Sequence, residues 1–286
     1  VTLLRSSTQA CAENMSPISL DALGLPLPLF KKRHVHLFDS KPWMASMTLA
    51  QVRNFLHCTC GKTFQHLTKR RQNADSVQLA EETTVEADDL SALGKYCISP
   101  LTTSHHCSLA QLFNPEGLHV DVFVSHAWGH ECRDFLACLE KFAECAVYEG
   151  VVDKASPDDV SFWIQGFSLN LNREEEATYA SVPLLESPSV QALERARCVL
   201  LVSDERASAL QRLWVLFELQ HSDGLGKLID CSVADISAAS RSLVNISASS
   251  GITSRSQDRS NILEIMQRFS SPIYGNGVYG VTESLL

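Results

Sequence analysis

Hydrophobic and polar positions follow two different periods along the chain, and the clearest segments lie after residue 118. Short apolar runs of strand length occur at 120–125, 160–164 and 198–202, and a more polar run follows at 227–233. Runs of this length that are rich in β-branched and aromatic residues are typical of buried strands. We therefore expect a strand at each of these positions.

Helical periodicity separates the runs. Apolar residues such as Phe135, Leu139 and Phe142 recur three or four positions apart, which predicts an amphipathic helix over 131–148. Shorter patterns predict helices at 189–197 and 213–221, and a last one near 262–269. Strands that alternate with helices indicate βαβ units, and their right-handed crossovers give a doubly wound parallel sheet. We expect an α/β fold with four to five strands.

The first third of the chain has a weaker pattern. Prolines interrupt it, and only two short helices are expected, over 44–55 and 81–93. We therefore expect an N-terminal extension over 1–115, mostly irregular with short helices. An α/β domain follows over 116–286, with its core at 118–235. Its last part, 236–286, combines a Ser-rich segment with the terminal helix.

Composition and charge narrow the function classes. With 45% hydrophobic and 20% charged residues the chain is globular in composition. Residues 101–286 contain 13 Lys and Arg against 24 Asp and Glu, a net charge of −11, which argues against nucleic acid as a partner. No apolar run approaches the roughly 20 residues that cross a bilayer, so no membrane partner is expected. Ten irregularly spaced cysteines are typical of reduced thiols, which predicts a cytoplasmic protein.

Three short motifs resemble a phosphate-binding loop, a zinc site and a hydrolytic dyad, but each lacks a feature that its function requires. Gly61-Lys62-Thr63 ends like a phosphate-binding loop, but the loop's first glycine is replaced by Leu56. The Cys58-Thr59-Cys60 spacing is too short for a zinc pair, so no metal and no required cofactor is predicted. Ser125 and His126 are neighbours, but adjacent strand residues point to opposite faces and no nucleophile elbow surrounds the serine. A hydrolytic dyad is therefore not expected.

The most informative residue is Glu218, a lone carboxylate in the apolar run 212–219. On a helix it shares one face with Trp214, four positions earlier. A carboxyl group beside an indole in a dry cleft has a raised pKa, and such groups serve in acid–base chemistry or steady a developing positive charge. The alternative is a structural glutamate paired with Arg212, and the sequence leaves both open.

Four segments, in this order and spacing, resemble a TIR-like domain of the variant found in algae and other protists. They are 121–129 (DVFVSHAWG), 162–170 (FWIQGFSLN), 198–204 (CVLLVSD) and 212–219 (RLWVLFEL). The last resembles the Trp-Cys-Leu-x-Glu-Leu segment of that family. The resemblance implies a flavodoxin-like sheet and one of two functional classes. One is a signalling or interaction domain that self-associates or binds other TIR-like domains, and the other is an NAD nucleosidase.

In the enzymes of the family the glutamate of this segment is catalytic, and Glu218 occupies its position. NAD would then be the substrate, cleaved between nicotinamide and ribose. Candidate contacts to the dinucleotide come from three places. The end of the first expected strand and the loop after it contribute Ser125, His126, Trp128 and Gly129, the loop after the second expected strand contributes Asn170, and the segment that contains Glu218 contributes Trp214. We favour the self-associating interaction domain, keep the nucleosidase as the alternative, and note nucleotide binding without turnover as a third class.

Overall fold

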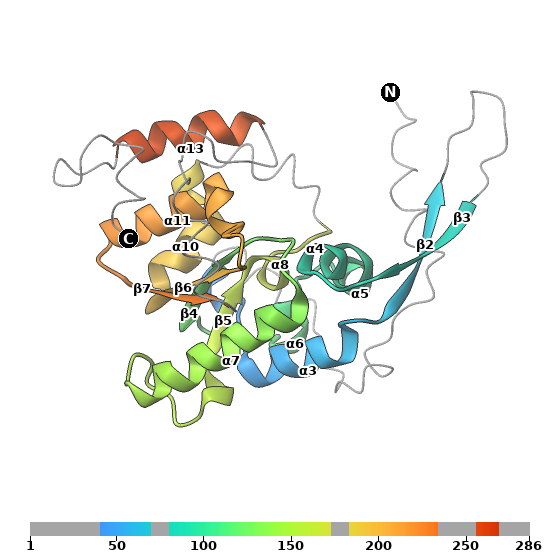
Figure 1. Cartoon of the computed structure of the whole chain (residues 1–286), viewed down its shortest axis with the longest axis horizontal. Helices are drawn as coiled ribbons and strands as arrows, with labels where there is room; N and C mark the ends of the chain where they lie inside the picture. The colour runs from blue at the N-terminus through green and yellow to red at the C-terminus, as the bar shows by residue number, and fades with distance from the viewer. Residues whose placement is uncertain (1–40, 70–79, 173–182, 234–255, 269–286) are drawn as a thin grey trace.

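A computed structural model describes residues 41–69, 80–172, 183–233 and 256–268. Its centre is a five-stranded sheet in the order β1-β5-β4-β6-β7 (Figure 1). The strands are β1 (Met47–Thr48), β4 (Val122–His126), β5 (Ser161–Ile164), β6 (Cys198–Ser203) and β7 (Leu228–Val233). All neighbours pair in parallel except β1, which runs antiparallel to β5 at one edge. The α/β class and the mostly parallel sheet are therefore confirmed, and the strand order is compatible with a flavodoxin-like arrangement.

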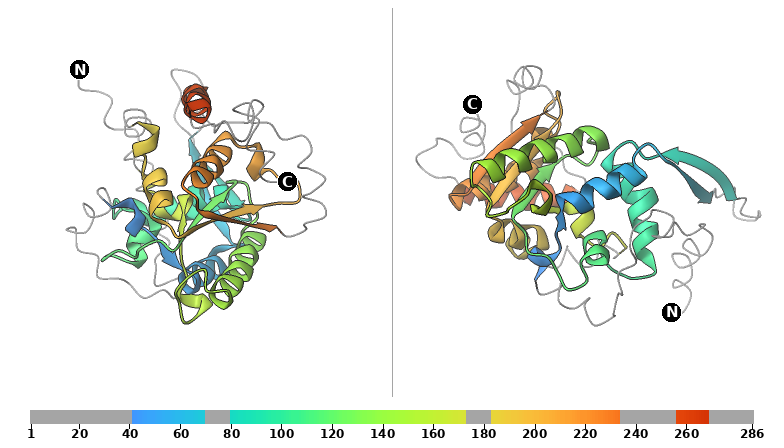
Figure 2. Two further views of the ribbon diagram at one scale, coloured as in Figure 1. Left: turned by 90° about the vertical axis from the view of Figure 1, so that its left-hand side faces the viewer. Right: turned by 90° about the horizontal axis from the view of Figure 1, so that it is seen from below.

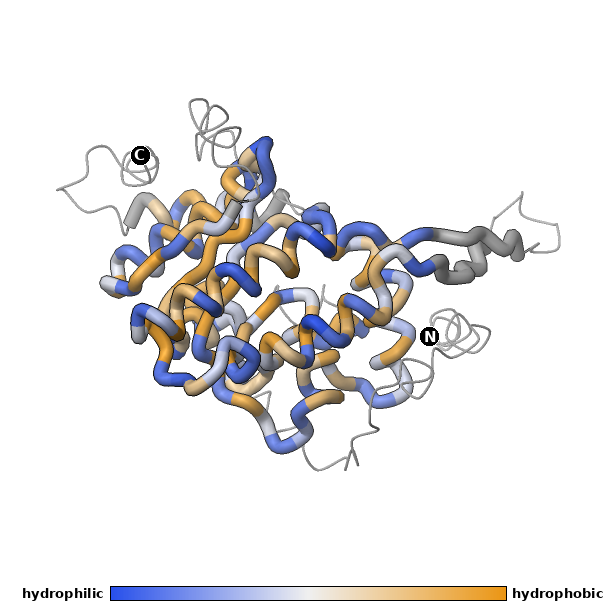
Figure 3. Tube along the Cα trace, turned by 60° about the horizontal axis from the view of Figure 1, so that its bottom comes forward, coloured by the Kyte–Doolittle hydropathy of each residue, from blue (hydrophilic) through white to orange (hydrophobic). Residues whose placement is uncertain are grey.

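Helices cover both faces of this sheet (Figure 2). One face carries α3 (Leu49–Thr59) and α7 (Cys132–Tyr148), and the other carries α10 (Pro188–Arg195) and α11 (Leu213–Gly224). Helix α13 (Ser256–Arg268) packs on α11. Successive strand residues alternate between these faces: Val122 and Val124 pack with the α3–α7 side, and Phe123 with the α10–α11 side. The strands form a hydrophobic centre, with polar positions mainly on the outside of the helices (Figure 3).

The helices predicted after residue 118 are present, and local sequence features explain where they begin and end. In α7 the side chains of Phe135, Leu139 and Phe142 are buried on one stripe, and Gly150 follows the helix with φ of 71°. In α10 the hydroxyl of Ser187 accepts a hydrogen bond from the Val190 N–H, and proline takes the first helical position. The terminal helix appears as α13, whereas 236–255 lies outside the described residues.

The segment before residue 116 packs into the same core as the sheet. Thr48 and Gln51 form a capping box at the start of α3, and this helix lies against α7. Arg53 of α3 donates to Glu140 of α7 at 2.6 Å and to Asp158 at 2.7 Å. The apolar cluster runs from Ala45 through α6 (Leu109–Phe113) to Phe162 of β5. Packing therefore continues across the expected boundary at residue 115.

Two helical predictions in this segment need correction. The helix expected over 44–55 begins only at Leu49, because the 3₁₀ turn η3 (Pro42–Met44) and strand β1 precede it. The helix expected over 81–93 is wrong: β2 (Thr63–Lys69) and β3 (Ala80–Glu86) form an antiparallel hairpin, and only α4 (Leu90–Leu93) is α-helical. The sequence Thr83-Thr84-Val85 is β-branched, which favours a strand over a helix.

Several short elements connect the longer helices and strands, among them the 3₁₀ turn η5 (Pro157–Asp159) before β5. The π-helical turn η4 (Gly94–Ile98) leads into α5 (Ser99–Thr103), and α8 (Gln165–Ser168) follows β5 directly. Two further 3₁₀ turns, η6 (Leu184–Glu186) and η7 (Ala209–Gln211), precede α10 and α11. Across the described ranges, no helix has the length and apolar character needed to cross a membrane.

Candidate functional site

The candidate site lies at the carboxyl ends of β4 and β6. After β4 the chain crosses to α7 on one face of the sheet, and after β6 it crosses to α11 on the opposite face. In open α/β sheets, neighbouring strands whose connections leave in opposite directions create a crevice, and ligands bind there. The predicted site residues Ser125 and Glu218 lie on the two elements, β4 and α11, that meet at this point.

A hydrogen bond connects these two residues. Ser125 is the fourth residue of β4, and its Oγ donates to Oε2 of Glu218 at 2.5 Å. Because a carboxylate oxygen accepts this hydrogen bond, Ser125 fixes the orientation of the Glu218 side chain. Glu218 lies in the second turn of α11 and is only 7% exposed. Ser222 lies one turn after Glu218, and its hydroxyl donates to the backbone carbonyl of Glu218 at 2.6 Å. This bond does not involve the Glu218 carboxylate, which accepts from Ser125.

Burial controls the electrostatics of Glu218. Removal of the carboxyl group from water raises its pKa to about 7, and the Ser125 hydrogen bond and the charge of Arg212 only partly oppose this rise. Arg212 precedes α11, and burial lowers the pKa of its guanidinium, which the charge of Glu218 counteracts. The two interpretations of Glu218 thus both have a physical basis here. The glutamate has a cationic neighbour, and it also titrates near neutral pH.

His126 faces the other side of the sheet. Its ring packs on the Phe135 ring of α7, with centroids 5.2 Å apart, and its Nδ1 lies 3.3 Å from the Val124 carbonyl oxygen. Burial lowers the pKa of His126 to about 4, so the imidazole is neutral. Ser125 and His126 therefore lie on opposite faces, as strand geometry predicts, and the Ser125 hydroxyl bonds to Glu218 instead.

Trp128 forms a wall beside the first-strand loop. It is half-buried, its Nε1 donates to Oε1 of Gln165 at 3.3 Å, and its ring covers Gly94 and Gly166. A Cβ added at Gly94 would lie 3.3 Å from this ring, so the glycine allows the indole to approach closely. Gly129, the next residue, is exposed, and an added Cβ there would meet nothing within 4 Å.

The other two predicted contact residues lie further along the chain. Asn170 follows α8 and is half-buried, and its Oδ1 accepts a hydrogen bond from the Asn172 N–H at 3.0 Å. Trp214 is in the first turn of α11, where its ring packs edge-on against Phe217 with centroids 6.0 Å apart. Ser125 and Glu218 are thus two predicted site residues that the structure bonds directly to each other.

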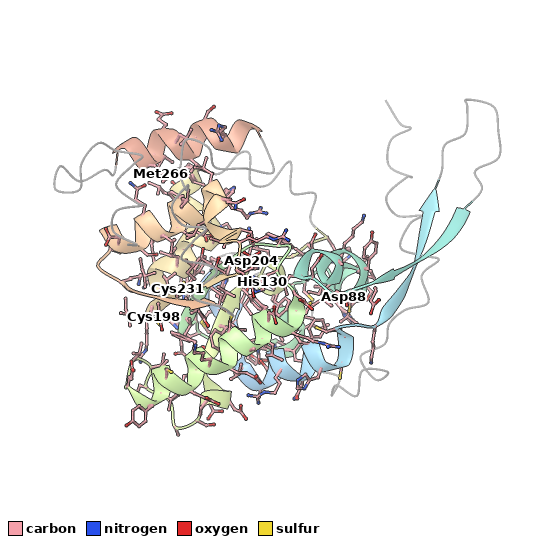
Figure 4. All side chains as sticks on the ribbon, in the orientation of Figure 1. Asp88, His130, Cys198, Asp204, Cys231 and Met266 are labelled. Carbon is pink, nitrogen blue, oxygen red and sulfur yellow. The ribbon has the colours of Figure 1, made fainter. Side chains whose placement is uncertain are left out.

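Two polar residues at this edge were not among the predicted contact residues. His130 follows the first-strand loop and Asp204 follows β6, and Figure 4 shows them next to each other. His130 is 2% exposed, and its Nδ1 has no hydrogen-bond partner among the described residues. Burial lowers the pKa of His130, and the charge of Asp204 opposes this effect. Their position directly after predicted strands is the signal that could have identified them.

Asp204 is held in its ionised form by its own loop. It accepts hydrogen bonds from the backbone N–H of Ser208 at 2.8 Å, from the Ser208 hydroxyl at 2.6 Å and from the Arg206 N–H at 3.1 Å. Burial opposes ionisation, but these bonds and the neighbouring His130 outweigh it, so the pKa of Asp204 lies below its ordinary value. Within the described part of the chain, no group of three His, Cys, Asp or Glu side chains is arranged to hold a metal ion.

Comparison of the chain with protein-family models, with curated proteins and with solved structures found no match. The fold is that of an α/β protein in which the connections after the neighbouring strands β4 and β6 leave on opposite faces of the sheet. Function is therefore inferred from the chemistry of Ser125, Glu218 and their neighbours.

Proposed function

We propose that the chain is a cytoplasmic TIR-like domain with a flavodoxin-like sheet, that it acts by self-association, and that its assembled form hydrolyses the nicotinamide–ribose bond of NAD. The strand order, with connections that leave β4 and β6 on opposite faces, is compatible with that fold. The cysteines in the described residues are all free thiols, which suits a reducing compartment. The Ser125–Glu218 bond is the observation that carries the enzymatic part of the proposal.

The chemistry requires one well-placed carboxylate. Cleavage breaks the bond from ribose C1′ to the nicotinamide nitrogen, and the electron pair leaves with the nicotinamide, which departs neutral and needs no acid. Positive charge develops on the ribose ring, and water then adds to C1′ and loses a proton. A carboxylate beside the ribose stabilises that charge, as the second carboxylate does in glycosidases. Glu218, ionised and oriented by Ser125, is assigned this role.

The surroundings supply contacts for the rest of the dinucleotide. Trp128 offers an indole face next to Gly129, where the backbone is open to an approaching ligand. Arg212 provides positive charge near Glu218 in a domain that is otherwise acidic, and this charge suits a pyrophosphate. The Nδ1 of His130 is a buried polar atom without a partner among the described residues, and it would reach a ligand oxygen only after the first-strand loop moves.

The burial of Glu218 suggests why activity would require assembly of several copies of the domain. With 7% of its surface exposed it cannot contact a ribose until α11 or the first-strand loop moves. We assign that movement to contacts between copies of the domain, since the family resemblance implies enzymes that act as assemblies. Activity should therefore depend on protein concentration more steeply than in direct proportion.

The test incubates the purified full chain with NAD at low and high protein concentration and measures nicotinamide by chromatography. We expect release at high concentration, its loss in Glu218→Ala, and its retention in Asp223→Ala, which removes an exposed acidic residue from the same helix. If forced oligomers release no nicotinamide, the enzymatic part is wrong and the interaction domain remains. If NAD or ATP raises the melting temperature without product, the site binds nucleotide without turnover.

A further inference from the structure

Two cysteines that are 72 positions apart in sequence meet where the N-terminal segment contacts α7. Cys60 directly follows α3, and Cys132 is the first residue of α7. Their side chains are hydrogen-bonded to each other. A Cβ added at Gly61 would lie 3.8 Å from Nη2 of Arg133, so the residues that follow the two cysteines also lie close together.

The backbone around both residues is fixed to one short segment. The Cys132 N–H donates to the Asp88 carbonyl at 2.8 Å, and the Gly61 N–H donates to the Ala87 carbonyl at 3.4 Å. The Cys60 N–H donates to the Leu56 carbonyl of α3 at 2.8 Å. Because neighbouring residues hold both cysteines to segment 87–88, the pair is prearranged in the folded chain.

The two thiols have unequal environments. Cys60 is half-exposed, and the hydrogen bond with Cys132 lowers its pKa; the positive charge of Arg133 acts in the same direction, while burial and Asp88 oppose it. Cys132 is buried, and its pKa is raised by the bond to Cys60 and by burial. Cys60 is thus the accessible nucleophile and Cys132 is the covered partner.

The other buried cysteines have surroundings that suppress reaction. Burial raises the pKa of Cys97, Cys107 and Cys198 to about 12 in each case. A buried thiol that keeps its proton is a poor nucleophile. These three cysteines are therefore not expected to compete with Cys60 as the attacking thiolate, and Cys132 is singled out by its hydrogen bond with Cys60.

We propose that Cys60 and Cys132 are a modification site at which a hydroperoxide produces a reversible disulfide. The Cys60 thiolate attacks the peroxide, so that a sulfur–oxygen bond forms, the oxygen–oxygen bond breaks and the leaving oxygen takes up a proton. The Cys132 sulfur, after losing its proton, attacks the resulting sulfenic acid and the hydroxyl leaves as water. In total, two thiols and one hydrogen peroxide give one disulfide and two waters.

The bond would join the N-terminal segment to the start of α7, two residues after His130. It closes a loop from residue 60 to residue 132, and a cross-link across a long loop stabilises the folded state. This inference is independent of the proposed NAD chemistry, because the reaction is followed on the thiols alone.

The test treats the reduced full chain with one equivalent of hydrogen peroxide, alkylates the remaining thiols and digests with trypsin and a Glu-specific protease. The expected product links the peptide 54–62 to the dipeptide 132–133, which contains Cys132 as its single cysteine. Titration under denaturing conditions should show free thiols falling from ten to eight, and dithiothreitol should restore ten. Cys60 should react about tenfold faster than the exposed Cys145.

Variants identify the two sulfurs. Cys58→Ser changes the other half-exposed cysteine at the end of α3, so it should leave the cross-link intact. Cys60→Ser should abolish the cross-link and keep all nine remaining thiols. The proposal is overturned if Cys60 pairs with Cys97, if the exposed cysteines are consumed first, or if Cys60→Ser loses two thiols as the unmodified chain does.

Discussion

Replacement of Glu218 by glutamine should change the pH dependence of stability. Glutamine has nearly the same shape as glutamic acid, accepts the Ser125 hydroxyl through its carbonyl oxygen and cannot ionise. The pKa of the Glu218 carboxyl group is raised from 4.5 to about 7 in the folded chain, chiefly by burial. The folded protein therefore binds more protons at this position than the unfolded chain does between these two pH values.

The magnitude follows from the difference between 4.5 and about 7, which corresponds to about 3 kcal/mol. Because the pKa is higher in the folded state, the stabilising contribution is present below pH 4.5 and is lost as the pH rises through 7. Near pH 4.5 the original chain and Glu218→Gln should have similar free energies of unfolding. Near pH 8 the variant should be more stable by up to about 3 kcal/mol.

Urea unfolding at a series of pH values from 4.5 to 8 measures this difference. The comparison between two nearly identical chains cancels the titration of all other groups. Glu186→Gln, on an exposed 3₁₀ turn, measures the effect of removing a negative charge from the surface. A difference between the original chain and Glu218→Gln that does not change with pH would refute the raised pKa of Glu218.

Three further outcomes follow from the same structure. Ser125→Ala should lower the free energy of unfolding by about 1–3 kcal/mol at pH 8, because the buried carboxylate loses its hydroxyl donor; an unchanged urea midpoint would contradict this. The His126 imidazole should stay neutral down to about pH 4 in an NMR titration, so its contribution to stability is lost as the pH falls below 6.5; a midpoint near 6.5 would contradict its burial. A chain that begins at residue 116 should lose cooperative thermal unfolding, because it lacks β1 and α3, and a sharp transition monitored by circular dichroism would show that 116–286 folds alone.

Much of the fold could be predicted because each parallel strand has its own pattern. The apolar runs at 120–125, 160–164 and 198–202 are local signals, and they became β4, β5 and β6. Strand β1 could not be predicted, since Met47–Thr48 is too short to show a period and forms only by pairing with β5. The hairpin was missed because a short helix was expected over 81–93, although the β-branched residues Thr83, Thr84 and Val85 favour a strand.

In the candidate site, too, features within one segment could be predicted, whereas contacts between distant segments could not. Glu218 could be singled out because a lone carboxylate in an apolar helix is visible in a single segment. Its bond to Ser125 could not, because 93 residues separate the two and only the topology brings the end of β4 to α11. His130 and Asp204 could be placed near strand ends from the sequence, but their proximity to each other depends on which loops the sheet brings together.

The most direct test of the enzymatic account is the rate of nicotinamide release at saturating NAD as a function of pH. If the ionised Glu218 stabilises the positive charge on the ribose, the rate should rise about tenfold between pH 6 and pH 8, with a midpoint near 7. Ser125→Ala, which removes a bond that lowers the pKa of Glu218, should move the midpoint to higher pH. A rate that does not change with pH, or that persists in Glu218→Gln, would contradict the account.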